Sequence, residues 1–270
     1  MRLDAVRLSG LMRREGEWLS QAVDAPEQAM HSVTDGLAEI TLGNLKVELR
    51  RAKRRAALLI GLADLGGVWS LNDVTGHLTK FANACVDASI KQLVAAEIDR
   101  GKLPGMGEND KADAAGMFAL AMGKMGGFEL NYSSDVDLIC MFDETRFAPD
   151  DYHDARAAFI RVTRKMAAML SDVTSDGYVF RTDLRLRPDP SVTPVCIAAE
   201  TAERYYESVG RTWERAAYIK AAPCAGDLAA GQRFLDTLRP FVWRKHLDFA
   251  SIQDAHDMRL RIRDHKGLGG

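Results

Sequence analysis

The 270-residue sequence has few cysteines, no long apolar run and no large excess of charge of either sign. Its four cysteines are far apart and never form a Cys-x-x-Cys pair. This argues against a zinc knuckle or a disulfide framework and favours small buried hydrophobes in a reducing compartment. No apolar stretch approaches the roughly 20 residues that span a bilayer, and the N-terminus lacks the apolar core of a signal peptide. We therefore expect a soluble, cytoplasmic protein with no membrane partner.

The charge balance also argues against a nucleic-acid partner. Lys and Arg number 36 and Asp and Glu number 38, whereas general nucleic-acid binders carry an excess of basic residues. One basic cluster stands out within a predicted helix, at Arg50, Arg51, Lys53, Arg54 and Arg55. It fits a solvated helix face, which is the commoner case, or a contact with phosphate or an acidic partner. No aromatic residues are interleaved with it as a stacking platform for bases.

The first hundred residues have the periodicity of helices. Apolar residues recur at helical spacing from Leu42 to Ala63, and Gly66-Gly67 ends this helix. A second helix is predicted from Val74 to Arg100, with Asn72 or Asp73 as its N-cap. The following ten residues are punctuated by Gly and Pro, which predicts a loop.

The pattern changes near residue 116. Strands are predicted for two short apolar runs, at 117–122 and 136–142, and for an alternating stretch at 178–186. A helix is predicted at 150–171. Strand, turn, strand, helix, strand describes a small α/β unit. From residue 198 through Arg263 the pattern is helical again. We expect an α+β protein with a helical region at 1–110, an α/β domain at 111–197 and the start of a helical bundle at 198–270.

Chemistry-bearing residues gather inside the α/β unit. Asp135 and Asp137 open the second predicted strand, and Asp183 lies on the third. Residues i and i+2 of a strand project to one face, about 6.5–7 Å apart, so the two acids project together and Asp183 can join them from a neighbouring strand. Mg²⁺ prefers such oxygen ligands, and two ions clamp the attacking and leaving oxygens of a phosphoryl transfer. The sequence predicts a two-metal site.

The first strand is followed by glycines that suit the same chemistry. Without Cβ atoms, Gly126 and Gly127 let backbone N–H groups approach a polyphosphate, and Lys124 adds positive charge. Taken singly, each feature has a commoner explanation: an Asp-x-Asp pair is frequent, Gly-Gly marks turns, and Asp183 can pair with Arg181 or Arg185. Their order, spacing and placement on strands together favour a nucleotidyl-transfer site.

Residues 122–139, MGKMGGFELNYSSDVDLI, closely resemble the signature of the bifunctional glutamine synthetase adenylyltransferase/adenylyl-removing enzymes. The resemblance continues through 180–188, 213–215, 219–221 and 240–248, and covers about residues 70–265. It implies a polymerase-beta-like nucleotidyltransferase domain at 111–197, flanked by mostly helical regions. Two departures are Pro188-Asp189-Pro190 in place of the family's Pro-Phe-Gly turn, and Ala222 in place of an Arg.

The resemblance assigns roles by position. Asp135, Asp137 and Asp183 match the family's catalytic, metal-binding acids, which implies Mg²⁺, two ions, as cofactor. Trp213, Glu214 and Lys220 match a helix that faces the site, and helix packing with a surface ion pair is an equally good explanation for these three residues. The residues expected to contact phosphate or nucleotide are Gly126, Gly127, Lys124, Ser134, Arg185, Arg187 and Lys220.

Family members carry two similar catalytic halves, and residues 129–135 resemble the N-terminal half. The resemblance implies that this half removes AMP from a tyrosine of glutamine synthetase by phosphorolysis, releasing ADP. It implies control by the PII regulatory protein and glutamine in nitrogen assimilation. Two alternatives are open: attachment of AMP from ATP, or a regulatory, protein-binding fragment without turnover. Because the sequence stops before the family's next segment, we expect a truncated chain.

Overall fold

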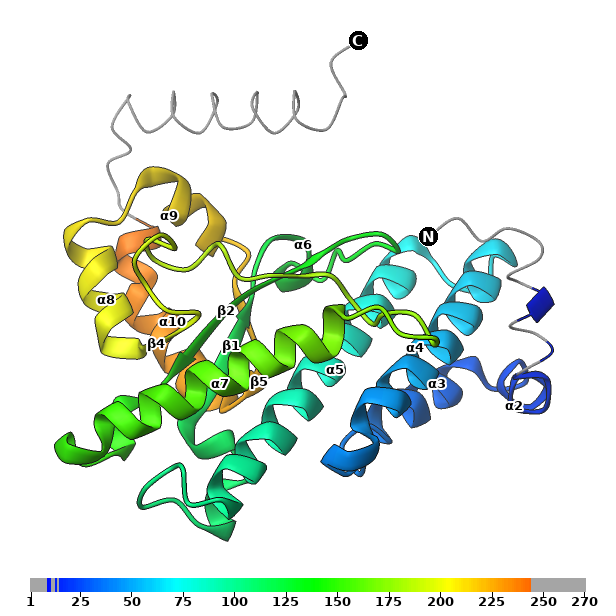
Figure 1. Cartoon of the computed structure of the whole chain (residues 1–270). Coiled ribbons are helices and arrows are strands. Elements are labelled where there is room, and N and C mark those ends of the chain that lie inside the picture. The colour runs from blue at the N-terminus through cyan, green and yellow to red at the C-terminus, as the bar shows by residue number, and fades with distance from the viewer. Residues whose placement is uncertain (1–8, 11–12, 14, 244–270) are drawn as a thin grey trace.

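The computed structural model describes residues 9–10, 13 and 15–243 (Figure 1). Within these residues, helices pack around one mixed sheet, and no helix is both long and apolar enough to cross a bilayer. The predicted helix beyond residue 243 lies outside the described part. The helices are α2 (Gly16–Ala22), α3 (Pro26–Asp35), α4 (Leu42–Leu65), α5 (Leu71–Asp99), α6 (Gly123–Gly126), α7 (Tyr152–Ser171), α8 (Ala199–Ser208), α9 (Thr212–Tyr218) and α10 (Leu228–Val242), with 3₁₀ turns η1 (Glu108–Asp110), η2 (Ala114–Gly116), η3 (Glu144–Arg146) and η4 (Pro149–Asp151). The strands are β1 (Met117–Ala121), β2 (Val136–Phe142), β3 (Thr182–Asp183), β4 (Cys196–Ala198) and β5 (Ala222–Gly226).

The two long N-terminal helices occur where the periodicity predicts them. Helix α4 ends at Gly66, and Gly67 follows with a positive φ of 66°. Helix α5 begins three residues earlier than expected, so the predicted N-cap was wrong. Ser70 is the cap: its hydroxyl accepts from the Asp73 N–H, and the Asp73 carboxylate accepts from the Ser70 N–H at 3.0 Å. This reciprocal capping box satisfies two otherwise unpaired donors.

The sheet has the order β3-β2-β1-β5, and β4 also pairs with β2. Strand β1 is antiparallel to β2 and β5, whereas β3 and β4 follow one another along β2, both parallel to it. The predictions of β1 and β2 are confirmed. The helical prediction after residue 198 was wrong at β5, because these residues pair with the free edge of β1.

The third predicted strand is much shorter than expected. Only Thr182 and Asp183 pair with β2. The preceding Val179 and Phe180 donate both backbone N–H groups to the Leu170 carbonyl, at 2.9 and 3.1 Å. The last turn of α7 therefore takes the backbone bonds that a longer strand would have used.

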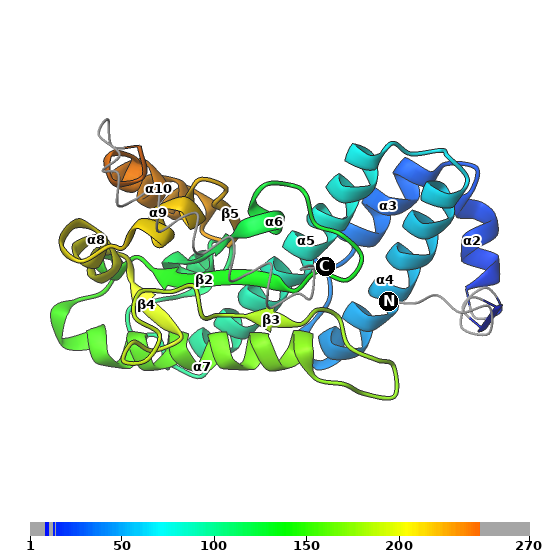
Figure 2. The same ribbon diagram turned by 90° about the horizontal axis from the view of Figure 1, so that it is seen from above.

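Both faces of the sheet are covered. Alternate residues of β1 and β2 pack into a core with α4, α5 and α7, and the others pack with α8 and α10 (Figures 1 and 2). Strands buried on two faces have nearly continuous apolar sequences, as these do. Asp137 interrupts β2 on the face that also carries Ile139 and Met141. All four cysteines are free and buried, which confirms their prediction as small core residues.

Arg50 shows that the basic cluster is not wholly a solvated face. Its side chain is only 1% exposed, and its guanidinium donates to the carbonyls of Gly177 at 2.8 Å, Asp172 at 2.6 Å and Lys46 at 2.7 Å. The first interpretation of the cluster was therefore wrong for Arg50, although Arg51 is exposed. Desolvation lowers the pKa of Arg50 from its usual value. Arg50 fixes the turn at 172–177 against α4.

We expect Arg50→Met to lower the free energy of unfolding by about 3 kcal/mol, because three carbonyls lose a charged donor in a buried place. Arg51→Met, on the same helix but exposed, should change it by less than about 0.5 kcal/mol. Urea unfolding of the two variants measures the difference. Equal stabilities would contradict a structural role for Arg50.

Candidate active site

The parallel pairing of β2 with β3 brings two of the predicted acids together. In this register Val136 lies opposite Thr182, and Asp137 lies opposite Asp183. Parallel register places the two carboxylates on the same face of adjacent strands. Asp135 precedes Asp137 by two residues and projects to the same side. Asp137 and Asp183 therefore lie side by side on adjoining strands, as the sequence predicts, whereas Asp135 lies one residue before the start of β2.

Two arginines accompany these acids. The Arg181 guanidinium donates to the Asp135 carboxylate at 2.5 Å, and Arg185 donates to Asp183 at 2.5 and 3.0 Å. The hydrogen bond from Arg185 holds the pKa of Asp183 below its usual value. Asp183, and less strongly Asp137 and Asp135, raise the pKa of Arg185. All three acids thus act on one guanidinium, so the cluster attracts positive charge.

The three acids do not form a preassembled site for a divalent cation. Among the described residues, no three carboxylate, imidazole or thiolate groups converge on a common point. The carboxylates do not converge because Asp135 is turned toward Arg181 and Asp183 toward Arg185. Both pairs are accessible, with Arg181 57% and Arg185 83% exposed, and exposed ion pairs are weak. The donor set consists only of carboxylate oxygens, the ligand type that Mg²⁺ prefers.

Helix α6 lies against the acid cluster. A Cβ built on Gly123 would be 3.3 Å from the Asp137 Oδ2 atom, so this carboxylate lies close to the start of α6. A Cβ on Gly126 would lie 2.0 Å from the Lys220 carbonyl oxygen and 2.4 Å from that of Ala121. Gly127 is less confined, since its Cβ would be closest to the flexible Lys220 side chain, at 3.0 Å, and in ordinary van der Waals contact with the Gly123 carbonyl oxygen at 3.5 Å. The two adjacent glycines therefore have different steric surroundings.

The other expected phosphate contacts are spread around α6 and β3. Lys124 is exposed on α6, and the Lys220 ammonium pairs with the Glu129 carboxylate at 2.6 Å. The Ser134 hydroxyl donates to Asn131 Oδ1 at 2.6 Å. Lys220 thus reaches the α6 side of the site from the segment before β5.

Arg187 and Glu214, which the sequence places near the site, make hydrogen bonds that stabilise the local structure. The Arg187 guanidinium donates to the carbonyls of Leu184 and Pro190 at 2.8 Å and to that of Thr193 at 3.1 Å, and desolvation lowers its pKa. It ties together the loop that follows β3. Glu214 is 2% exposed and accepts from the Arg211 N–H at 2.7 Å at the start of α9. This favours helix packing for Glu214, and a phosphate role for Arg187 stays a prediction.

The sequence reasoning did not single out Glu129 or the pairing of Arg181 with Asp135. Glu129 lies within the family motif, and nothing in its spacing indicates that Lys220 is its partner. Arg181 was recognised as a basic neighbour of Asp183. Its alternation with Asp183 along one face was the available signal, because this places it beside Asp135 across the strand pair.

The sheet and the placement of its acids define a domain of the nucleotidyltransferase type. Comparison with known proteins shows which family within this class the chain belongs to. A family model described as "Glutamate-ammonia ligase adenylyltransferase" matches residues 6–237, and the chain belongs to that family. It is therefore related to nucleotidyltransferase enzymes that act in adenylyl transfer.

Individual relatives agree with the family. The chain is 45% identical over 268 residues to the bifunctional glutamine synthetase adenylyltransferase/adenylyl-removing enzyme of Bradyrhizobium sp. strain BTAi1, covering 99% of this chain and 27% of that protein. It is 43% identical over 264 residues to the protein of the same name from Caulobacter vibrioides, covering 96% and 27%. The Bradyrhizobium diazoefficiens protein is 52% identical over 221 residues, covering 81% and 22%. The chain spans about a quarter of the length of these relatives.

Proposed function

We propose that this chain carries the adenylyl-removing site of such an enzyme and removes the AMP group from an adenylylated tyrosine of glutamine synthetase by phosphorolysis, releasing ADP. The observation that carries the proposal is the register that sets Asp137 beside Asp183, with Asp135 two residues earlier. The relatives' names supply glutamine synthetase and both reaction directions. The resemblance of residues 129–135 to the N-terminal half supports removal over attachment.

In the proposed reaction an oxygen of inorganic phosphate attacks the phosphorus of the AMP group. The new P–O bond gives ADP, the P–O bond to tyrosine breaks, and the phenolate oxygen takes a proton from solvent. Two Mg²⁺ ions held by Asp135, Asp137 and Asp183 would stabilise the charge on the attacking and leaving oxygens. Arg181 and Arg185, released from the acids, would neutralise phosphate oxygens nearby.

The partners of this reaction belong to the proposal. Phosphate and ADP follow from the direction of the reaction, and ATP from the alternative direction. The PII protein and glutamine are proposed as regulators on the strength of the sequence resemblance. The four free, buried cysteines support a reducing compartment, the cytoplasm.

A paired assay separates the two directions. One reaction contains the chain, Mg²⁺, phosphate and adenylylated glutamine synthetase, and ADP release is followed. The other contains Mg²⁺, ATP and unmodified glutamine synthetase, and AMP incorporation is followed. We expect ADP in the first and no incorporation in the second. Incorporation in the second alone would reverse the assignment, and no turnover in either would favour a regulatory role without catalysis.

A further inference from the structure

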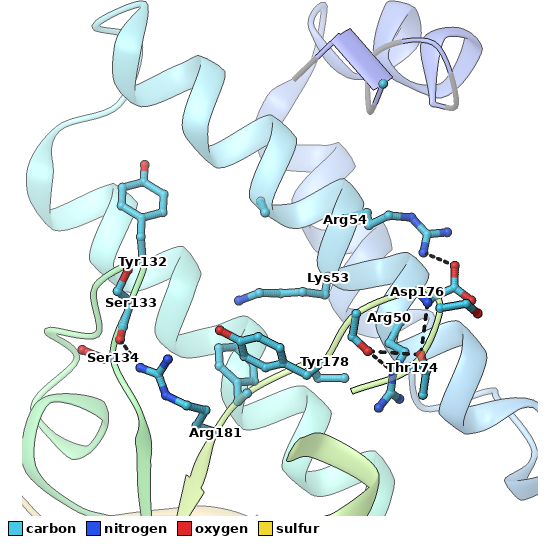
Figure 3. A pocket seen from close by; sticks show the side chains of 16 residues that line it. Arg50, Lys53, Arg54, Tyr132, Ser133, Ser134, Thr174, Asp176, Tyr178 and Arg181 are labelled. Atoms are coloured by element: carbon cyan, nitrogen blue, oxygen red, sulfur yellow. Dashed lines mark hydrogen bonds and ion pairs between the residues drawn. The ribbon is translucent and has the colours of Figure 1, made fainter. Parts of the chain in front are cut away.

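A pocket of about 690 Å³ lies beside the acid cluster, on the α4 side of β3 (Figure 3). Its wall comes from four parts of the chain: α4, the segment 174–181, the residues 132–134 that lead into β2, and Gly10 near the N-terminus. The volume is in the range of small-molecule sites. The side chains that matter are Arg50, Lys53, Arg54, Tyr132, Tyr178 and Arg181.

Lys53 differs from the other cations of this pocket. Arg54 pairs with the Asp176 carboxylate at 2.8 Å, and Arg50 donates to three carbonyls. The contacts of the Lys53 ammonium within the described residues are instead with rings, 3.9 Å from the centre of Phe180 and 5.8 Å from that of Phe81. Burial without a carboxylate partner lowers the pKa of Lys53 to about 8. The fold therefore holds a poorly compensated positive charge in a cavity, at a cost to stability.

Arg181 connects this pocket to the acid cluster. It lines the pocket, yet it pairs with Asp135 and donates to the Ser133 carbonyl at 2.9 Å. In Figure 3 the Lys53 side chain crosses the pocket from α4 toward the side where Tyr132, Ser133 and Arg181 lie. Two cations thus face one cavity from opposite walls.

Two exposed tyrosine rings complete the wall. Tyr132 is 38% and Tyr178 42% exposed, and both line the pocket. The Tyr132 hydroxyl is held by Asp64 at 2.7 Å, which fixes its ring at the edge of the cavity. Aromatic faces beside cations suit a ligand that has both a planar ring and a negative charge.

We infer that this pocket binds a phosphate-bearing ligand through Lys53 and Arg181, with Tyr132 and Tyr178 flanking any ring that the ligand carries. The pocket adjoins the acid cluster through Arg181, but none of the three acids lines it. A phosphate that recruits Arg181 also draws it away from Asp135 and leaves that carboxylate for a cation. Ligand binding in the pocket then strengthens Mg²⁺ binding at the acids, and by reciprocity Mg²⁺ strengthens ligand binding. This coupling, unlike the binding itself, rests on the proposed function.

Calorimetric titration with AMP and with inorganic phosphate, in EDTA and without Mg²⁺, tests the binding. Lys53→Met removes the charge and keeps the aliphatic stem over Phe180. Lys46→Met is the control, on the same helix but exposed and outside the pocket. We expect Lys53→Met to weaken binding at least about tenfold, as for loss of a charged hydrogen bond, and Lys46→Met to bind as wild type. Equal binding by Lys53→Met and wild type, or no binding of either probe to wild type, would overturn the inference.

Comparison of the two probes, together with two further variants, identifies the class of ligand and shows whether it binds in the pocket or at the acid cluster. Tighter binding of AMP than of phosphate, with the difference lost in Tyr178→Ala, supports a nucleoside phosphate. Equal affinities support the free anion in the same pocket. Asp137→Asn should bind both probes like wild type, because Asp137 does not line the pocket. This expectation holds whether or not the acids bind a metal ion. Loss of anion binding in Asp137→Asn would place the anion at the acids and sink the pocket assignment. A circular dichroism melt of Lys53→Met shows that it folds, and removal of the buried charge should raise its melting temperature.

Discussion

Asp137→Asn is expected to abolish Mg²⁺ binding at the acid cluster and to lower the rate of nucleotidyl transfer about a thousandfold. Asp137 lies between the other two acids, two residues after Asp135 and opposite Asp183 across the strand pair. Without its charge, the remaining carboxylates cannot bridge two ions, and the several kcal/mol that metal ions contribute to the transition state are lost. Each 1.36 kcal/mol is a tenfold change in rate. Titration with Mg²⁺ and the phosphorolysis assay measure the two effects.

The matched control is Asp236→Asn, an exposed position on α10 outside the cluster. It should leave both metal binding and rate unchanged. Asparagine has the size of aspartate, and its introduction removes a negative charge directly opposite Asp183, so Asp137→Asn should not unfold the chain. Metal binding equal to that of Asp236→Asn, in a folded Asp137→Asn protein, would refute the three-acid assignment.

The elements that the sequence predicted well are those whose burial follows one simple period. In α7, Phe159, Val162, Met166 and Leu170 are all buried, as the helical spacing predicted. Strand β2 has the predicted bounds, because an apolar run of seven residues buried on two faces has few alternatives. Such local signals sufficed for most of the core around the site.

Strand β5 could not be predicted in this way. Its sequence, Ala222-Pro223-Cys224-Ala225-Gly226, has no β-branched or aromatic residue and resembles a turn. It is a strand because the far edge of β1 is available, where Gly226 pairs opposite Phe118 with a positive φ of 72°. A Cβ on Gly226 would lie 2.0 Å from the Met117 carbonyl oxygen. Tertiary pairing, which no local pattern contains, decides this element.

In the candidate site, too, some features follow from local periodicity and others only from tertiary contacts. Strand periodicity was enough to place Asp137 and Asp183 on adjoining strands, with Asp135 just before β2. The side-chain partners of these acids depend on which neighbour is nearest after folding. Lys53 and Tyr178 are far apart in the sequence but line one pocket, because Arg50, Lys46 and Arg54 hold the 172–177 turn against α4. The pocket is thus a product of tertiary contacts. The sequence of the basic helix alone left two interpretations open: a solvated face, or a contact with phosphate or an acidic partner.

Gly126→Ala is expected to lower the free energy of unfolding by about 3 kcal/mol or more. The added methyl group would overlap the carbonyl oxygens of Lys220 and Ala121, which are backbone atoms and cannot rotate away. Overpacking of this kind forces backbone shifts, here between α6, the end of β1 and the segment before β5. Urea unfolding gives the change.

Gly127→Ala is the matched comparison, because the one tight contact of its methyl group would be with the Lys220 side chain, which can move. We expect it to cost less than about 1 kcal/mol. The pair separates two explanations of the glycines: close packing of α6, or close approach of the backbone to phosphate. A stable Gly127→Ala protein with weakened nucleotide binding would assign the phosphate role to Gly127 and the packing role to Gly126. If Gly126→Ala is as stable as wild type, the contact with Lys220 does not constrain α6, and phosphate approach becomes the better explanation for both residues.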